Sequence, residues 1–222
     1  MLGLIYDRFS ALGKFFSRFR LNKLVHDSCE GRNLGRVLFV GSGGQLEAFC
    51  RQFQSESFTT IDIDAARRPD KVMDISRLDI KDTTIDTIFL LEVLEHVQKP
   101  QAAIDECFRV LRENGRVILS TPFVFGIHDE PSDFFRYTRY GLMNLFVGKK
   151  WRKDFLSERT GFLWTIGVLL SRLSTDNSKT VKLIGLTFIV IFLFVAPIIL
   201  VIDRILPNTI TTGYVAVFSK KL

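Results

Sequence analysis

Residues 36–44 read Arg-Val-Leu-Phe-Val-Gly-Ser-Gly-Gly, an apolar run that enters a glycine-rich turn. The run predicts a buried β-strand over 36–40, and the residues after the turn, 45–53, predict a helix. A second predicted strand, 58–61, leads into Asp62. Glycines let a nucleotide approach the backbone, and an acid at the tip of the next strand can hold ribose hydroxyls. We therefore expect a nucleoside-containing cofactor at the carboxyl end of an α/β sheet.

The composition limits the class of protein. The chain has 222 residues, enough for one α/β domain that buries its own core. Its three cysteines lie far apart and form no CxxC or Cys/His cluster, which predicts structural thiols in a reducing compartment and no metal site. The formal net charge of +6 favours an anionic partner, either nucleic acid or an anionic membrane leaflet.

Predicted strands and helices alternate through the first half of the chain. The predicted strands are 36–40, 58–62, 85–91 and 115–121. A helix with one apolar face is predicted over 101–112, and the pair Asn114-Gly115 is expected to end it. This alternation is typical of a doubly wound, mostly parallel sheet, whose ligands bind beyond the carboxyl ends of the strands.

A dinucleotide site is the first interpretation of the glycine turn. The GxGxxG pattern would need glycine at position 46, where the chain has Leu46. Gly41 and Gly43 alone are weak evidence for NAD. An NAD-dependent enzyme is therefore disfavoured, and it would be recognised by NADH binding.

A second pattern covers about 100 residues. Residues 89–97 read Phe-Leu-Leu-Glu-Val-Leu-Glu-His-Val, Pro100 and the predicted helix follow, and then 115–123 form a further strand pattern. The order and spacing of these pieces resemble the class I S-adenosylmethionine-dependent methyltransferases. The Leu-Glu-His signature after the fourth strand points in particular to their broad type 11 group.

The resemblance implies a fold and a domain organisation. The fold is an α/β, doubly wound, mostly parallel, seven-stranded Rossmann-like sheet with an apolar helical insertion before the last strand. Residues 212–221 would be that last strand, and 151–158 its partner. Residues 1–31 would be a basic amphipathic N-terminal helix, 32–222 the methyltransferase-like domain, and 161–205 a membrane-associated insertion.

The resemblance also implies S-adenosylmethionine as cofactor. The implied binding residues are Gly41, Ser42 and Gly43 beneath the methionine part, Asp62 (with Asp64 as the alternative) at the ribose hydroxyls, Asp74 and Ile75 at the adenine, and Glu92 near the methionine part. Asp74 has a second interpretation as a turn residue. Two positions depart from the family pattern, because Phe39 stands where an acid is usual and Gln45 where a further glycine is frequent. A lost acid predicts weaker cofactor binding.

The loop after the predicted strand 115–121 contains the candidate catalytic residue. It includes His128, Asp133 and Arg136 in a spacing that resembles a subgroup of the family. Histidine titrates near neutral pH, so His128 is the candidate general base. The alternative is that these three residues hold the loop through ion pairs. In the family, Glu95 and His96 organise the loop after the fourth strand, and methyl transfer can proceed mainly by positioning.

Residues 183–202 contain no charge and are long enough to cross a membrane. A single crossing would separate the last strand from its sheet, so we expect a re-entrant or interfacial helix, bent at Pro197. Residues 161–170 would form a second apolar helix, joined to the first through 174–179. The alternative is a soluble helical pair that packs on the domain or on a partner.

These observations favour one function. We expect S-adenosylmethionine-dependent methyl transfer to a lipid-linked or small amphipathic acceptor. The protein would be peripheral or monotopic on the cytoplasmic side of the membrane, and the lipid surface of the membrane would be one of its partners. Nucleic acid is not expected as a substrate, because the chain has neither the Asn/Asp-Pro-Pro-aromatic motif of DNA amino-methylating enzymes nor an RNA-binding motif. The alternative is a non-catalytic methyltransferase-fold interaction protein in a membrane complex, for which Phe39 is the best support.

Overall fold

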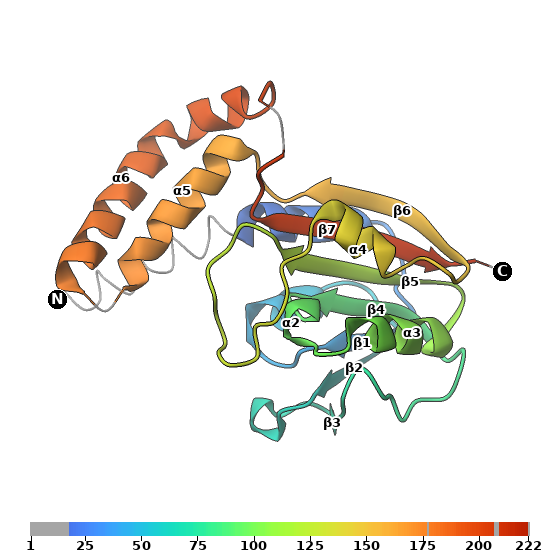
Figure 1. Ribbon diagram of the computed structural model, residues 1–222. Helices are drawn as coiled ribbons and strands as arrows, with labels where there is room; N and C mark the ends of the chain where they lie inside the picture. Colours follow the sequence, from blue (N-terminus) through green and yellow to red (C-terminus); the bar gives the residue numbers. More distant parts are fainter. Residues whose placement is uncertain (1–17, 177, 207–208, 222) are drawn as a thin grey trace. The chain divides into compact units, whose positions relative to one another are not determined.

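The computed structural model describes residues 18–176, 178–206 and 209–221 (Figure 1). The chain divides into two compact units. Among the described residues, the sheet unit comprises 24–123, 127–157 and 214–221, and the helical unit comprises 18–23, 124–126, 158–176, 178–206 and 209–213. Most of the predicted N-terminal amphipathic helix, residues 1–17, lies outside the described residues. Residues 18–29 of that prediction are helical.

Seven strands form one sheet in the order β3-β2-β1-β4-β5-β7-β6. Their bounds are β1 Arg36–Val40, β2 Ser57–Asp62, β3 Lys71–Val72, β4 Ile85–Leu91, β5 Leu111–Pro122, β6 Trp151–Glu158 and β7 Gly213–Lys220. The pairs β1–β2, β1–β4, β2–β3 and β4–β5 are parallel. The predicted Rossmann-like sheet is confirmed, with β7 inserted between β5 and β6 after the apolar helices (Figure 1).

The central strands are buried because both faces of the sheet are covered. Leu38 and Val40 of β1 belong to a large apolar cluster that also contains residues of β4, β5 and β7. Phe39 alternates to the other face, where its ring lies 5.7 Å from that of Phe58 and 6.0 Å from that of Phe89, between ring centroids. Phe39 is therefore a core residue held by two aromatic neighbours.

Two predicted helices of the sheet unit, 45–53 and 101–112, are present in part, and a third helix was not predicted. The three helices are α2 Gly44–Cys50, α3 Pro100–Val110 and α4 Arg139–Asn144. The predicted end of the second helix at Asn114-Gly115 is wrong, because α3 ends at Val110. Leu111 is fully buried and pairs with Ile85 as the first residue of β5. The turn signal acts inside β5 and not at the end of the helix, because Asn114 has φ +62° and the register of β5 against β4 shifts between Leu111 and Arg116.

The strand order places the ligand crevice. The strand order reverses at β1, because the chain runs outward from β1 through β2 to β3 and then crosses back to β4 on the other side of β1. In open α/β sheets, ligands bind at the carboxyl ends of the strands at this switch point. The chain leaves β1 at Gly41, whose N–H donates to the Ile61 carbonyl at 2.9 Å. The ends of β1, β2 and β4 therefore form the floor of the candidate site.

The helical unit contains a helical hairpin made of α5 Phe162–Arg172, the short 3₁₀ turn η3 Leu173–Thr175 and α6 Lys179–Ile202. The two predicted apolar helices are thus present, and α6 continues through Pro197. Gly167 admits the ring of Phe192, because an added Cβ would lie 2.0 Å from that ring. Trp164 packs edge-on against the same ring. The helices contact each other through this small-residue position.

Asp203 closes the open end of the hairpin. Its two carboxylate oxygens accept the N–H groups of Leu163 and Trp164, each at 2.9 Å. Gly161 makes room for this contact, because an added Cβ would lie 2.4 Å from Cγ of Asp203. A carboxylate on the first turn of a helix satisfies unpaired N–H groups and favours the helix dipole. The end of α6 therefore caps the start of α5.

We expect Asp86→Asn to lower the free energy of unfolding by about 1–3 kcal/mol. Asp86 is buried at the start of β4, accepts the Arg36 N–H at 2.8 Å and its Nε at 3.0 Å, and forms an ion pair with Arg112. Burial raises the pKa of Asp86, but these hydrogen bonds and charges outweigh it, so the pKa lies below its usual value. Urea unfolding at pH 7 measures the loss.

The same substitution should change the pH dependence of stability. Because the folded pKa is depressed, the contribution of Asp86 is complete above about pH 5 and is lost as the pH falls through the folded pKa. Asp86→Asn should therefore lose less stability than the parent between pH 5 and pH 3. The exposed Glu113→Gln serves as control. Equal stability of Asp86→Asn and the parent at pH 7 would contradict the assignment.

Candidate active site

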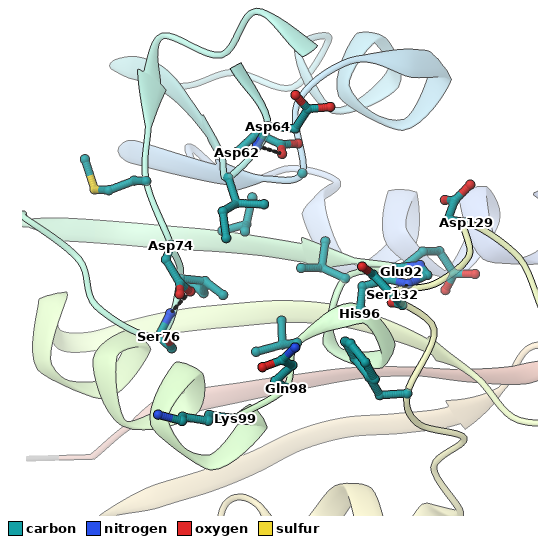
Figure 2. A pocket seen from close by; sticks show the side chains of 18 of the residues that line it. Asp62, Asp64, Asp74, Ser76, Glu92, His96, Gln98, Lys99, Asp129 and Ser132 are labelled. Atoms are coloured by element: carbon teal, nitrogen blue, oxygen red, sulfur yellow. Dashed lines mark hydrogen bonds between the residues drawn. The ribbon is translucent and has the colours of Figure 1, made fainter. Parts of the chain in front are cut away.

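A cavity of about 570 Å³ lies where β1, β2 and β4 end (Figure 2). Its wall includes Val40 and Gly41 from the end of β1, Asp62 from β2, and Glu92 and Val93 after β4. It lies at the switch point of the sheet, as expected for an α/β ligand site. The size suits a nucleoside-containing ligand.

The glycine turn requires glycine wherever its φ angle is positive, at Gly44 (φ +84°) as well as at the two glycines before it. Gly41 has φ +89° and Gly43 has φ +87°, a region that other residues rarely adopt. A Cβ on Gly41 would also lie 2.9 Å from Cγ2 of Val93, in the loop after β4. Gly41 lines the cavity, whereas Ser42 is buried in the turn and Gly43 donates its N–H to Glu47 at 2.6 Å. Of the three predicted turn residues, Gly41 alone is among the residues that line the cavity.

Both candidate ribose acids lie on the cavity wall. Asp62 is nearly buried at the end of β2, and its Oδ1 accepts the Asp64 N–H at 2.9 Å (Figure 2). Asp64 is exposed, and its carboxylate accepts the Ala66 N–H at the start of a short 3₁₀ turn, η1 Ala65–Arg67. Asp64 thus has a local capping role. The buried carboxylate of Asp62 at the strand end matches the predicted ribose position better.

Asp74 and Ile75 form another part of the wall. Oδ1 of Asp74 accepts the Ser76 N–H at 2.8 Å, so Asp74 is a turn residue as well as a cavity residue (Figure 2). Ile75 is 5% exposed and offers an apolar surface to the cavity. An acid beside an apolar side chain can bind the amino edge and the face of an adenine. Both predicted roles of Asp74 are compatible with this geometry.

Glu92 is held in an unusual backbone conformation. Its φ is +55°, in the left-handed region where a non-glycine residue is uncommon and which is associated with functional sites. Its N–H donates to the Ser120 carbonyl at 3.0 Å, and the Ser120 hydroxyl donates to Glu92 Oε1 at 2.7 Å. These contacts from β5 fix the carboxylate of Glu92 at the cavity (Figure 2).

Sequence reasoning missed many of the cavity residues. They are Val40, Ile63, Arg67, Met73, Ser76, Val93, His96, Val97, Gln98, Lys99, Asp129, Ser132 and Phe134. Most of them follow a strand end, which is the signal that could have found them. The residues of the wall include five carboxylates and two basic side chains, Arg67 and Lys99. An acidic wall attracts a cationic ligand and opposes a pyrophosphate.

His128, the candidate general base, is not among the residues that line the cavity. Its backbone N–H donates to Asp133 Oδ2 at 2.9 Å, and its Nδ1 lies 3.4 Å from the same oxygen. Arg136 binds both oxygens of Asp133, at 2.6 Å and 2.5 Å, and these hydrogen bonds hold the pKa of Asp133 well below its usual value. The loop is therefore held by the ion pairs of the alternative interpretation. The catalytic role of His128 stays a prediction.

Comparison with known proteins gives the family. Residues 39–119 match the model of a family described as Methyltransferase domain, a little more than a third of the chain. The chain carries a class I S-adenosylmethionine-dependent methyltransferase domain. Its cofactor is S-adenosylmethionine, and the carboxylates on the cavity wall suit the sulfonium and ammonium charges of that molecule. None of the curated proteins matches the sequence of the chain.

Solved structures similar to the methyltransferase domain are distant in sequence. A methyltransferase from Methanosarcina mazei is 14% identical, with 89% of this chain and 97% of that chain covered and a TM-score of 0.53. A geranyl diphosphate methyltransferase is 12% identical, with 91% and 78% covered and a TM-score of 0.57. The [4+2]-cyclase SpnF is 15% identical, with 91% and 80% covered and a TM-score of 0.57. At these identities the likeness shows the fold alone.

The residues of the cavity wall fit the cofactor. Gly41 gives the backbone clearance, the carboxylate of Asp62 can accept two ribose hydroxyls, and Asp74 with Ile75 can hold the adenine. When bound, S-adenosylmethionine supplies an activated methyl group on sulfur. Phe39 lies in the core and not among the cavity residues, so the departure at that position does not obstruct the site.

We expect Asp62→Asn to weaken binding of the cofactor analogue sinefungin by about 10- to 100-fold, the range for a lost charge-assisted hydrogen bond. The amide oxygen of Asn can still accept the Asp64 N–H, so the turn is preserved. Asp64→Asn is the matched control and should change the affinity much less. Titration calorimetry measures both variants. Equal effects of the two substitutions would show that Asp62 is not the ribose ligand.

Proposed function

We propose that the protein transfers a methyl group from S-adenosylmethionine to a lipid-linked or amphipathic acceptor at the cytoplasmic face of a membrane. The observation that carries the membrane part is helix α6. It has 24 residues, is long and apolar enough to cross a bilayer, and only 17% of its most apolar stretch is buried. The core helix of a soluble protein is mostly buried, so this exposure favours contact with lipid.

The exposed side chains of α6 are large and apolar. Phe194 is 80% exposed, Leu183 65%, Val201 63% and Ile198 61%. No charged residue interrupts the helix between Leu183 and Ile202. An exposed apolar surface of this kind costs free energy in water, at about 25 cal/mol per Å². Insertion into a bilayer removes that cost.

The sheet topology favours a helix that enters the membrane without crossing it. β6 precedes α5 and β7 follows α6, yet the two strands are neighbours in one sheet. The hairpin must therefore leave and rejoin the same side of a membrane. With 11 residues, α5 is about 16 Å long, too short to cross a hydrocarbon core of about 30 Å. A monotopic hairpin meets both conditions.

Membrane insertion would serve an acceptor that resides in lipid. Methyl transfer is an in-line displacement at the sulfonium carbon, and it is accelerated mainly by positioning the two reactants. The geranyl diphosphate methyltransferase of similar fold was solved in complex with GPP and sinefungin. An isoprenoid-type or lipid-linked acceptor is therefore compatible with this fold.

A methyl-labelling experiment tests the proposed reaction. Purified protein and S-adenosylmethionine with a labelled methyl group are incubated with membrane extract, and the product is identified by mass spectrometry. We expect the label in the lipid fraction with the parent protein, and much less with Asp62→Asn. Sinefungin binding without any labelled product would instead favour the non-catalytic interaction protein. Label confined to protein or nucleic acid would contradict the proposed acceptor class.

We expect removal of apolar side chains from α6 to abolish membrane binding. The triple variant Phe194→Ser, Ile198→Ser and Val201→Ser should bind liposomes at least about 1,000-fold more weakly, since each large apolar side chain contributes about 1.5–3 kcal/mol on burial. Flotation with liposomes that contain anionic lipid measures this.

The matched control removes equally exposed apolar residues from the sheet unit. Val72, Ile127 and Val147 are 58%, 72% and 70% exposed. The triple variant that replaces them with serine should float like the parent. Failure of the parent to float as a monomer, or equal flotation of both triple variants, would rule out the membrane role of α6.

A further inference from the structure

We propose that Glu95, His96 and His128 form a binding site for a divalent transition-metal ion, with Zn²⁺ as the best-suited ion. One ligand atom from each of the three residues lies within 4.8 Å of the other two. Glu95 is fully buried, and the side chains of His96 and His128 are 20% and 22% exposed. The cluster lies in the sheet unit, and His96 also lines the cofactor cavity (Figure 2).

Backbone contacts bring the two histidines together. Glu95 and His96 belong to the short 3₁₀ turn η2, Leu94–His96, after β4. The Glu95 carbonyl accepts hydrogen bonds from the N–H groups of Phe134 and Phe135, at 2.8 Å and 3.2 Å. These hydrogen bonds hold the loop that contains His128 against this turn. The imidazole rings pack edge to face with centroids 5.0 Å apart. The arrangement is therefore set by the fold.

The contact of His96 with Ser132 determines its tautomer. Nδ1 of His96 lies 2.6 Å from the Ser132 carbonyl oxygen, which can only accept a hydrogen bond. Nδ1 therefore carries the proton, and Nε2 holds the lone pair of the neutral ring. Nε2 lies 3.8 Å from Oε1 of Glu95. His96 thus presents an electron-pair donor beside a carboxylate oxygen.

His128 has a similar environment, in which its Nδ1 faces a carboxylate instead of a backbone carbonyl. Its Nδ1 lies 3.4 Å from Oδ2 of Asp133, another group that accepts when ionised, and Arg136 keeps Asp133 paired. Nε2 of His128 lies 4.0 Å from the same Oε1 of Glu95. Nε2 of each histidine therefore lies within 4.0 Å of the same carboxylate oxygen.

This donor set and its supporting contacts are typical of metal centres. Two histidines and one carboxylate bind Zn²⁺ or Fe²⁺ in sites that keep positions for water or substrate. A metal-bound histidine usually donates its other N–H to a carbonyl or carboxylate. His96 does so to the Ser132 carbonyl, and Nδ1 of His128 lies 3.4 Å from the Asp133 carboxylate. Tetrahedral Zn²⁺ at about 2.0 Å from nitrogen needs ligand atoms about 3.3 Å apart. Movements of about half an ångström would close the present spacing.

A metal here would deepen the proposed function, and this part of the inference rests on it. Three protein ligands leave a coordination position for a hydroxyl of the acceptor, and coordination lowers the pKa of a bound hydroxyl. His128 would then act through the metal and would not itself need to take the acceptor proton. The binding of the metal can be measured without cofactor or acceptor, so the two hypotheses can fail separately.

Titration of the chelator-treated full chain with Co²⁺ and Zn²⁺ tests the site. We expect one Co²⁺ per chain with visible absorption bands typical of nitrogen and oxygen ligands, displaced by Zn²⁺. Glu95→Gln and His128→Asn should each weaken binding by about 100-fold, since each removes a ligand. Circular dichroism and sinefungin binding establish that each variant is folded.

The control removes a second group of possible metal ligands in the described part of the chain. His26, Asp27 and Glu30 form an exposed cluster on the helix at residues 18–29 and beside its end. His26→Asn should leave Co²⁺ binding unchanged. No binding by the parent, loss of binding in His26→Asn, or unchanged binding in folded Glu95→Gln and His128→Asn would each overturn the proposal. Lipid methylation by the chelated protein would leave the proposed function intact and confine the site to a structural role.

Discussion

The left-handed backbone at Gly41 is the constraint on which the site depends. Gly41 ends β1 with φ +89° between two neighbouring strands, and its N–H is bound to the Ile61 carbonyl of β2. On the other side, the side chain of Val93 after β4 leaves no room for a Cβ. The chain must turn here without a side chain, and the cavity opens where it does. Asp62 and Glu92 reach the cavity because their strands end beside this turn.

The position of Asp62 could be predicted from the strand that it ends, because parallel strands end at one edge of the sheet. Asp74 and Glu92 were predicted from the resemblance to the methyltransferases. Contacts between distant segments were beyond such reasoning. Leu111 joins β5 only because Ile85 pairs with it. His96 and His128 meet only because a loop far along the chain is bound to the Glu95 carbonyl.

Phe39 illustrates how a motif position can change its role without loss of the site. In the sequence, Phe39 occupies the position before the glycine turn where the family usually has an acid. In the fold, its ring lies between Phe58 and Phe89 on the face of β1 opposite Leu38 and Val40. A carboxylate among these rings would be desolvated at a cost of several kcal/mol. Aromatic packing thus replaces a polar contact, and the acidic character of the cavity rests on its other carboxylates.

The apolar hairpin can be added to this fold because it is complete in itself. Asp203 caps the first turn of α5, Gly167 receives the ring of Phe192, and Gly185 lies against the backbone of Ser174. These contacts join α5 to α6 without any help from the sheet strands. The strands on either side of the hairpin need only be neighbours, as β6 and β7 are. An insertion between neighbouring strands can therefore acquire a lipid-facing surface while the register of β1, β2 and β4, and with it the cofactor cavity, stays unchanged.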